Sequence, residues 1–446
     1  MDKAQIISKV QQAGVVGAGG AGFPTHVKLD AQVERVLANG ASCEPLLMSD
    51  PYLMEAMPEK VLAGVRLAMA ATGAGEGLVC LKGKHDHAMA SLRQAVSQNG
   101  DGLGVFELGD FYPAGDEQVL VYEVTGRVVP EGGIPLMVGA VVSNVESLIN
   151  LAEAMEDKPV THRYLTVGGE VARPMVTRVP IGVSLQEVID QAGGPTMDGC
   201  RILVGGPMMG AVAADSAAPV TKTTSGVILL PAGHNVVADK SKDLDRVRNL
   251  ARVACCQCTR CTDLCPRNLL GHGLYPHKIM RQLGAQGGPN LELQVDALIC
   301  SECGICEKFA CPMQLAPREI NAAIKQQLMA QGIKRGEPRV EYRPSTFRQY
   351  RKIPTSHLME RLRVTRYDVH PPFVEYQGSP REVRIPLKQH LGAPAQAVVS
   401  PGDQVRAGQV IGEIPEGSLG ARVHASIAGS VTAVDDAVTI AASKEV

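Results

Sequence analysis

Eight of the twelve cysteines in this 446-residue chain lie in two short runs, and no other feature restricts the fold as strongly. The first run has the spacing C-x2-C-x2-C-x3-C-P and contains Cys255, Cys258, Cys261 and Cys265. The second has the spacing C-x2-C-x2-C-x4-C-P and contains Cys300, Cys303, Cys306 and Cys311. Each run therefore offers three thiols at one short, repeated interval and a fourth thiol immediately before a proline.

This spacing is typical of chains that wrap cubane iron–sulfur clusters. The close triplet places three thiolates around one 4Fe–4S cluster, and the cysteine before proline reaches across to the other cluster. We therefore expect one cluster on the first triplet together with Cys311. The second triplet together with Cys265 is expected to hold the other cluster.

Zinc is the main alternative, because C-x2-C pairs also build tetrahedral zinc sites. A zinc site needs only four ligands in closed pairs, so it leaves the third cysteine of each triplet and the two Cys-Pro endings unexplained. Cys256 lies outside the pattern. We expect it to be a buried thiol, or a thiol that lies beside a cluster without binding it.

Length and composition exclude several classes of protein. A chain of 446 residues predicts about three domains. The net charge of −2 gives no electrostatic reason for nucleic-acid binding, and the absence of Trp with only six Phe argues against base-stacking surfaces. No secretory signal opens the chain, and no apolar stretch approaches the roughly 20 residues of a membrane span. Thiols that hold clusters favour a reducing, cytoplasmic-type compartment.

A glycine-rich loop follows a predicted helix at residues 2–12. Its segment from Gly17 to Gly22 matches G-x-G-x-x-G, but a helix rather than a strand precedes it, so it does not fit the Rossmann context. Glycines without a Cβ let backbone N–H groups approach a phosphate or a flat ring closely. A nucleotide or flavin site and an ordinary glycine-rich turn both remain open at this point.

The first 158 residues alternate between short apolar strands and helices, which predicts an α/β domain with a mostly parallel sheet. Strands are expected at 33–38, 77–81, 104–108 and 138–142, and further helices at 51–71, 85–97, 116–123 and 145–155. Ligands of such sheets sit beyond the carboxyl ends of the strands. Residues 39–44 and 143–144 fall at those ends.

Four further regions follow this domain. Residues 159–235 carry short strands at 164–167, 176–179, 201–204 and 226–230 around one helix at 184–192, which fits a β-grasp module. Their glycine-rich loop 205–210 is either a turn or a contact with a cofactor or partner. Residues 240–332 hold the cysteines, between helices expected at 240–252, 274–283, 291–299 and 318–331. Residues 333–382 have little periodicity and are interpreted as a wrapping connector.

Residues 383–446 return to short strands, expected at 390–394, 399–405, 409–414 and 423–434. Their glycine and hydrophobic pattern is similar to the barrel-sandwich fold of biotinyl and lipoyl carriers. The carrier lysine is absent, because the second hairpin reads Ala425-Ser426-Ile427-Ala428-Gly429. We interpret this region as a structural or docking module.

The order of these parts resembles a family of flavin- and iron–sulfur-containing reductases. The first 155 or so residues are similar to the NADH-oxidising flavin subunit of respiratory complex I and to the RnfC component of the Rnf electron-transport complex, through segments 17–28, 39–45, 112–117 and 143–148. Over its whole length the chain most resembles the cobalamin reductases of propanediol-utilising bacterial microcompartments. In the RnfC component the barrel-sandwich precedes the flavin domain, so domain order favours the reductase family.

The resemblance implies residues for an FMN and NADH site. Those implied in cofactor binding are Gly17, Gly19, Gly20, Phe23, Lys28, Asn39, Tyr112, Asp116 and Asn144. Glu44 and Glu117 are implied to face the NADH and to take part in catalysis. The chain departs from the complex I pattern at Ala18, Ala41 and Ser42, and Asp116 stands where that family has Glu.

The resemblance also implies a reaction. NADH gives up two electrons together, a 4Fe–4S cluster accepts one at a time, and a flavin converts between the two. We expect electrons to pass from NADH through FMN and two clusters to cobalamin, towards cob(I)alamin for an adenosyltransferase partner in a microcompartment that degrades propanediol. A peripheral electron-transfer subunit of an Rnf-like membrane complex is the alternative.

Overall fold

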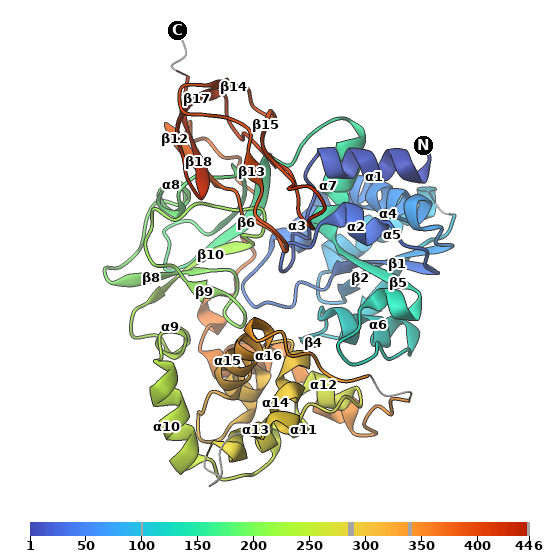
Figure 1. Cartoon of the computed structure of the whole chain (residues 1–446), viewed down its shortest axis with the longest axis vertical. Coiled ribbons are helices and arrows are strands. Elements are labelled where there is room, and N and C mark those ends of the chain that lie inside the picture. Colours follow the sequence, from blue (N-terminus) through green and yellow to red (C-terminus); the bar gives the residue numbers. More distant parts are fainter. Residues whose placement is uncertain (100, 284–289, 338–340, 444–446) are drawn as a thin grey trace.

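The computed structural model describes residues 1–99, 101–283, 290–337 and 341–443. Figure 1 shows four modules: the N-terminal α/β domain, a second sheet beside it, a group of helices at one end of the long axis, and a β-rich C-terminal region at the other. No helix in the described part of the chain is long and apolar enough to cross a membrane.

The α/β domain is built on a four-stranded parallel sheet of order β3-β2-β1-β5. Its strands are β1 Arg35–Gly40, β2 Glu76–Lys82, β3 Leu103–Leu108 and β5 Ala140–Asn144. Its helices are α1 Lys3–Gln12, α2 Thr25–Leu29, α3 Ser49–Ala56, α4 Pro58–Thr72, α5 Asp86–Asn99, α6 Glu117–Thr125 and α7 Val145–Met155. The expected parallel α/β arrangement is confirmed.

The single helix expected at 51–71 is wrong, because the structure has two helices, α3 and α4. Pro58 begins α4, and Met57 before it has φ −137° and ψ 45°, outside the helical region. Proline lacks a backbone N–H and clashes with a helical residue before it, so the chain turns at this point.

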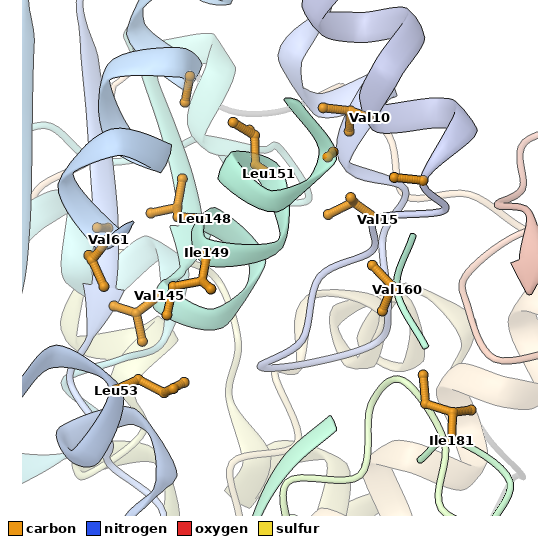
Figure 2. Close-up of a cluster of buried hydrophobic side chains, with 14 of the residues drawn as sticks. Val10, Val15, Leu53, Val61, Val145, Leu148, Ile149, Leu151, Val160 and Ile181 are labelled. Carbon is orange, nitrogen blue, oxygen red and sulfur yellow. The ribbon is translucent and has the colours of Figure 1, made fainter. Parts of the chain in front are cut away.

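The main core lies between the helices on one face of this sheet. Figure 2 shows Val145, Leu148 and Ile149 of α7 beside Val61 of α4, with Val10 and Val160 farther along. Helices α4 and α7 approach closely because Gly64 has no side chain: a Cβ there would lie 2.1 Å from the carbonyl oxygen of Leu148. This packing holds the N-terminus of α7, where a candidate site residue lies.

The second module has a five-stranded sheet of order β7-β6-β10-β8-β9, in which β6 and β10 are parallel and the other pairs antiparallel. Its elements are β6 His162–Gly169, β7 Met175–Pro180, α8 Leu185–Gln191, β8 Cys200–Val204, β9 Ala211–Val212 and β10 Gly226–Pro231. The Ser184 and Glu187 side chains form a capping box at the start of α8. The expected β-grasp module is confirmed.

The cysteine-bearing module is helical. Its helices are α9 Asn235–Lys240, α10 Leu244–Ala254, α11 Arg260–Asp263, α12 Pro266–Leu269, α13 Pro276–Gln282, α14 Leu291–Gln294 and α15 Pro317–Ala330, with a 3₁₀ turn Val295–Ile299 and a π turn Cys306–Ala310. The expected helix 240–252 instead begins at Leu244, because the Asp243 side chain accepts from the Arg246 N–H (2.9 Å) and caps it. The expected helix 291–299 becomes 3₁₀ from Val295.

The connector contains more structure than its composition indicates. Strand β11 Ile353–Pro354 pairs with β4 Phe111–Tyr112 of the first domain, and α16 Thr355–Leu362 follows it. Leu358, Met359 and Leu362 of α16 are buried in one cluster with Tyr112 and Cys303. The connector therefore holds the α/β domain and the cysteine module together, although its residues 338–340 lie outside the described structure.

The C-terminal module packs two small antiparallel sheets, β12-β18-β17-β14 and β13-β15-β16. The strands are β12 Glu382–Pro386, β13 Gln396–Ala397, β14 Gln404–Val405, β15 Val410–Glu413, β16 Val423–His424, β17 Gly429–Val434 and β18 Ala437–Ala442. The strand expected at 390–394 is wrong: Gly392 has φ +116° in a turn, and the His390 ring accepts from the Ala421 N–H (3.0 Å). The expected strands 399–405 and 423–434 are also shorter or interrupted.

Candidate functional site

A cavity of about 440 Å³ lies beyond the carboxyl ends of β1 and β5, within the usual size of small-molecule sites. Most of its lining comes from the α/β domain, but Arg163 and Ser225 come from the β-grasp module and Leu391 from the C-terminal module. A second cavity, of about 490 Å³, lies between α8 and residues 374–379, and none of the predicted site residues line it. The first cavity is therefore the candidate site.

The glycine-rich loop forms one wall of this cavity and is anchored on its far side. The Gly17 N–H donates to the Phe23 carbonyl (2.9 Å), and the Ala18 N–H donates to the Ser147 hydroxyl (2.8 Å). A Cβ on Gly19 would lie 2.9 Å from the Asn144 amide nitrogen, whereas a Cβ on Gly20 would meet no atom within 4 Å. Gly19 thus needs its missing side chain for close packing, and Gly20 faces open space.

The glycine-rich loop has three backbone N–H groups that are available to an anionic ligand. Among the described residues, the N–H groups of Gly19, Gly20 and Ala21 donate to no partner. Unpaired backbone donors in a glycine-rich loop are suited to a phosphate or to the polar edge of a ring. Together with the ammonium of Lys28 in the same cavity, this donor set fits the phosphate and the ring of a flavin mononucleotide.

Lys28 and the two asparagines are held in place by the strand ends. The Lys28 ammonium donates to the Val142 carbonyl of β5 (2.8 Å) and pairs with Glu117 (3.2 Å) at the mouth of the cavity. Asn39 donates to the Gly115 carbonyl (2.8 Å). Asn144 caps α7 by accepting from the Glu146 N–H (2.9 Å). The structure therefore brings these predicted residues together in one cavity.

The cavity also contains two polar residues that the sequence analysis missed. Asp50 accepts from the Asn144 side chain (2.9 Å), and burial raises the pKa of its carboxyl to about 6. Arg163 of β6 pairs with the buried Glu146 and donates to the Ala18 carbonyl (2.9 Å). Asp50 follows the predicted strand-end segment by only six residues, a signal that could have found it. Arg163 reaches the cavity only through contact between modules.

Glu44 lies at the inner edge of the cavity and faces the β-grasp module. Its carboxylate accepts from the N–H groups of Met208 (3.0 Å) and Met209 (2.7 Å). Burial raises the pKa of this carboxyl, and these two hydrogen bonds act in the opposite direction. The Lys240 ammonium donates to the Met208 carbonyl (3.0 Å) and braces the same loop. The sequence allows loop 205–210 to be either a turn or a contact with a cofactor or partner. In the structure this loop packs against Glu44 of the α/β domain.

Tyr112 and Asp116 lie outside the cavity lining, at the contact with the cysteine module. The Tyr112 hydroxyl donates to the Cys303 carbonyl (2.7 Å). Asp116 caps α6 and forms two hydrogen bonds with the Arg267 guanidinium (2.6 and 2.9 Å). Both side chains of this ion pair are nearly buried, at 10% and 9% exposed. These two predicted cofactor residues thus connect the α/β domain to the cysteine module, Tyr112 at the second cysteine run and Asp116 just after the first.

Three thiols gather around that of Cys261, and we call the four together the outer group: Cys255, Cys258, Cys261 and Cys311. Burial raises the pKa of the Cys261 thiol to about 12, and its three neighbours in the group add to the shift. All four residues line one small cavity. Cys256 lines the same cavity and is exposed, so of the two expectations the buried thiol is wrong, and the thiol lies beside the group instead.

The remaining four thiols form the inner group: Cys265, Cys300, Cys303 and Cys306. Burial raises the pKa of the Cys303 and Cys306 thiols, and Cys265 and Cys300 add to the shift in both. Each group thus combines a triplet with the Cys-Pro cysteine of the other run, the sets that the spacing predicts.

One hydrophobic cluster runs from the cavity to the inner group. Leu47 lines the cavity and is buried in the same cluster as Tyr112, Met208 and Cys303. Cys43 also lines the cavity and packs against this cluster. The inner group is therefore reached from the cavity through continuous protein packing.

Comparisons with known proteins match each module. Residues 10–153 match the Nuo51 FMN-binding domain, residues 164–212 the SLBB domain, residues 254–316 the 4Fe-4S dicluster domain, and residues 370–446 the RnfC barrel sandwich hybrid domain. The first three matches lie within the expected domains. The fourth begins inside the expected connector, so the boundary near residue 382 stays a prediction.

Two relatives match over nearly the whole chain. Cobalamin reductase PduS of Salmonella typhimurium is 44% identical over 439 residues, which cover 98% of this chain and 96% of the relative. Cobalamin reductase PduS of Citrobacter freundii is 42% identical, with the same coverage. The C component of the Na⁺-translocating ferredoxin:NAD⁺ oxidoreductase complex of Acetobacterium woodii is 38% identical, over 60% of this chain and 59% of that relative.

Among solved structures, an NAD⁺-reducing NiFe-hydrogenase in the H₂-reduced state superposes with a TM-score of 0.50 at 24% identity. The superposition covers 75% of this chain and 64% of the hydrogenase chain. At this level of identity the likeness concerns the fold alone.

Proposed function

The chain belongs to the family of PduS cobalamin reductases, and from that premise we propose that it carries electrons from NADH to cobalamin. The proposal rests on identity over almost the full length, which includes the FMN-binding and 4Fe–4S dicluster regions. The Rnf-like alternative has less support, because the relative of that kind aligns with only 60% of this chain.

In this proposal the cavity beyond β1 and β5 holds FMN. The free N–H groups of Gly19 and Gly20 and the Lys28 ammonium bind its phosphate, and Phe23 packs beside it. Asn39 and Asn144 stand at the strand ends and orient the ring. When bound, FMN takes the two electrons of NADH together and releases them one at a time. Glu117 at the mouth and Glu44 at the inner edge are proposed to position the NADH.

The structural observation that supports the electron path is the continuous cluster of buried side chains between this cavity and the inner group. It contains Leu47, Tyr112, Met208 and Cys303, with Cys43 packed against it. Because these side chains are in continuous contact, single electrons have a short protein path to the cysteine module. The eight thiols of the inner and outer groups are proposed to hold the two 4Fe–4S clusters.

We further propose that the cobalamin product serves an adenosyltransferase partner, and that the protein works in a bacterial microcompartment that degrades propanediol. This finer statement depends on the family resemblance, since the relatives are cobalamin reductases by name. It is separable from the electron path itself, which uses only residues of this chain.

The decisive experiment uses protein purified without oxygen. NADH is added and the spectra of cob(III)alamin and cob(II)alamin are followed, with and without the adenosyltransferase. We expect the flavin band to bleach, cobalamin to be reduced, and adenosylation to speed the final step. A Lys28→Met variant is expected to lose FMN, and Lys388→Met, which changes an exposed lysine outside the cavity, is the matched control.

Two results would overturn the proposal. One is protein that contains zinc and no inorganic sulfide. The other is a stable complex with integral membrane proteins together with no reduction of cobalamin, which would favour the Rnf-like alternative.

A further inference from the structure

The two thiol groups face different parts of the molecule. The inner group is covered by the first two modules: Tyr112 donates to the Cys303 carbonyl, and a Cβ on Gly304 would lie 3.3 Å from the Met208 methyl. In the outer group Cys258 is exposed, and Cys255 and Cys261 are half-buried. Figure 1 shows α10, α11 and α13, which adjoin the outer group, at the end of the long axis opposite the C-terminal module.

Helix α10 presents an apolar stripe to solvent directly before the outer group. Val247 and Ala251 face the core, whereas Arg246, Leu250 and Val253 share another face because they are spaced four and three residues apart. Val253 is 84% exposed, the highest value among the large apolar side chains that the structure describes, and Leu250 is 47% exposed. Met313, two residues after Cys311, is also 47% exposed.

Exposed arginines lie on α10 and on the helices α11 and α13 that adjoin the outer group, although the whole chain has a net charge of −2. The arginines Arg246, Arg252, Arg260 and Arg281 are exposed and form no ion pair with any described residue. The acidic side chains on the same elements are partly neutralised: Asp245 pairs with Arg248 (3.2 Å), and Asp263 lies 3.6 Å from Arg351. Asp243 is used as the cap at the far end of α10.

We propose that electrons leave the protein at the outer group, and that Leu250, Val253 and Met313 with the four arginines form a docking surface for an acidic protein that carries a one-electron acceptor. We call these seven residues the exit surface. Exposed apolar side chains accompanied by unpaired positive charge on the same and neighbouring helices are complementary to an apolar patch with acidic side chains beside it. This inference rests on the proposed function, because it assumes that the thiol groups hold clusters.

The direction of transfer follows from the same contacts. The inner group adjoins the cluster that reaches the cavity. Both groups border one core, which includes Cys265, Cys311, Cys255 and Cys300. Electrons therefore pass from the flavin site to the inner group, then to the outer group, and leave the protein from there. One electron leaves at each encounter: the acceptor is reduced by one electron and the outer cluster oxidised by one. Two encounters match the two electrons of one NADH. Under the proposed function, the acceptor is a corrinoid cobalt bound to the partner.

A protein partner fits the exit surface better than an anionic membrane does. Helix α10 has only 11 residues, and its other face, which carries Val247 and Ala251, is buried in the module core. Three exposed apolar side chains offer far less area than an interfacial helix buries in a bilayer. The partner is therefore taken to be an acidic protein, and vesicle binding is one outcome of the test.

The test uses the holoenzyme and two haem proteins of opposite charge as one-electron probes: the acidic soluble domain of cytochrome b5 and the basic cytochrome c. The charge-reversal variant is R246E/R252E/R260E, and its matched control is R201E/R381E/R406E, three exposed arginines on other modules with the same change in charge. NADH-driven haem reduction is measured at low ionic strength, and flavin bleaching is recorded in every variant to check electron entry.

We expect the charge-reversal variant to reduce the acidic probe about tenfold more slowly and the basic probe faster, both effects fading at high salt. The control is expected to change either rate by less than about twofold. In the parent protein, the acidic probe should slow amide hydrogen exchange over residues 244–262. Leu250→Ser with Val253→Ser should weaken probe binding about three- to tenfold, whereas Met137→Ser with Val398→Ser, exposed elsewhere, should not.

Three outcomes would overturn the inference: an equal effect of the control variant, protection from exchange on another module, or protection of 244–262 by anionic phospholipid vesicles and not by the acidic probe. Failure of the proposed function looks different. In that case NADH still drives haem reduction through the exit surface, while cob(II)alamin and cob(III)alamin are not reduced under any condition.

Discussion

The inner and outer groups each offer four cysteine sulfur atoms, but they differ in how other modules and solvent surround them. Cys265, Cys303 and Cys306 of the inner group are 7–8% exposed, and residues from other modules cover them. The outer group includes the exposed Cys258 and borders a solvent-facing surface. Solvent access, hydrogen bonds and nearby charge tune the potential of a cluster. Identical ligand sets can therefore serve as a protected relay and as an accessible exit.

The largest effect should come from removing one ligand of each group in turn. We expect Cys303→Ser to lower NADH-driven reduction of cytochrome c by at least about 100-fold, because the relay next to the flavin is lost. Cys258→Ser is the matched variant and should keep the inner cluster reducible by NADH. Iron and sulfide content and EPR spectra of the reduced proteins measure both. Loss of all NADH-reducible cluster signal in Cys258→Ser would reverse the assigned order.

The ion pair that joins the α/β domain to the inner group should have the next largest effect. Arg267→Met leaves the Asp116 carboxylate buried without a partner, so the free energy of unfolding should fall by about 3 kcal/mol. Arg351→Met is the control, since its 3.6 Å contact with Asp263 is partly exposed and should contribute about 1 kcal/mol or less. Urea unfolding monitors both variants. An equal decrease in the free energy of unfolding in both variants would mean that the Asp116–Arg267 ion pair does not stabilise the inner group more than a surface ion pair does.

Tyr112→Phe should have a smaller effect. The variant leaves the Cys303 carbonyl without its buried donor, which should cost about 1–2 kcal/mol. It should also shift the reduction potential and the EPR signal of the inner cluster alone, because only that cluster loses a nearby hydrogen bond. Tyr350→Phe, at a side chain 77% exposed, serves as the control. A shift in both cluster signals would contradict the separation of the two groups.

The smallest effect is expected at Cys256. Its thiol is exposed and stands outside both groups, so Cys256→Ser should retain the full iron and sulfide content and the parental rate of haem reduction. Chemical analysis and the haem assay decide this directly. Loss of iron would mean that the outer group draws its ligands from five thiols rather than four.

Much of the fold could be predicted from local patterns. Helix 145–155 and the four strands of the parallel sheet were found because buried strands and amphipathic helices repeat at fixed periods. The prediction failed where the deciding interaction is not periodic. Pro58 breaks the expected helix 51–71, and the Asp243 cap places the start of α10 later than expected. In the connector, α16 buries Leu358 and Leu362 in a cluster with residues of other modules, which no local pattern indicates.

The residues of the candidate site also fall into those that the sequence could predict and those that depend on contacts between modules. Asn39 and Asn144 lie at the strand ends of one parallel sheet, so their meeting in a cavity follows from topology. Gly19 and Gly20 on the loop, Lys28 in α2 and Glu117 at the start of α6 line the same cavity. Tyr112 and Asp116 sit close to them in sequence, yet they point to the cysteine module. Arg163 reaches the cavity from another module. A local sequence pattern does not indicate which other module a side chain will contact.

By itself, the sequence determined which thiols can gather, because the cysteines of each triplet are three positions apart and must stay close, and a Cys-Pro ending recurs in each run. Only the tertiary structure decided which group lies against the cavity and which meets solvent. That choice depends on contacts such as Tyr112 with Cys303, between residues 191 positions apart in the chain, and packing between whole modules sets such contacts.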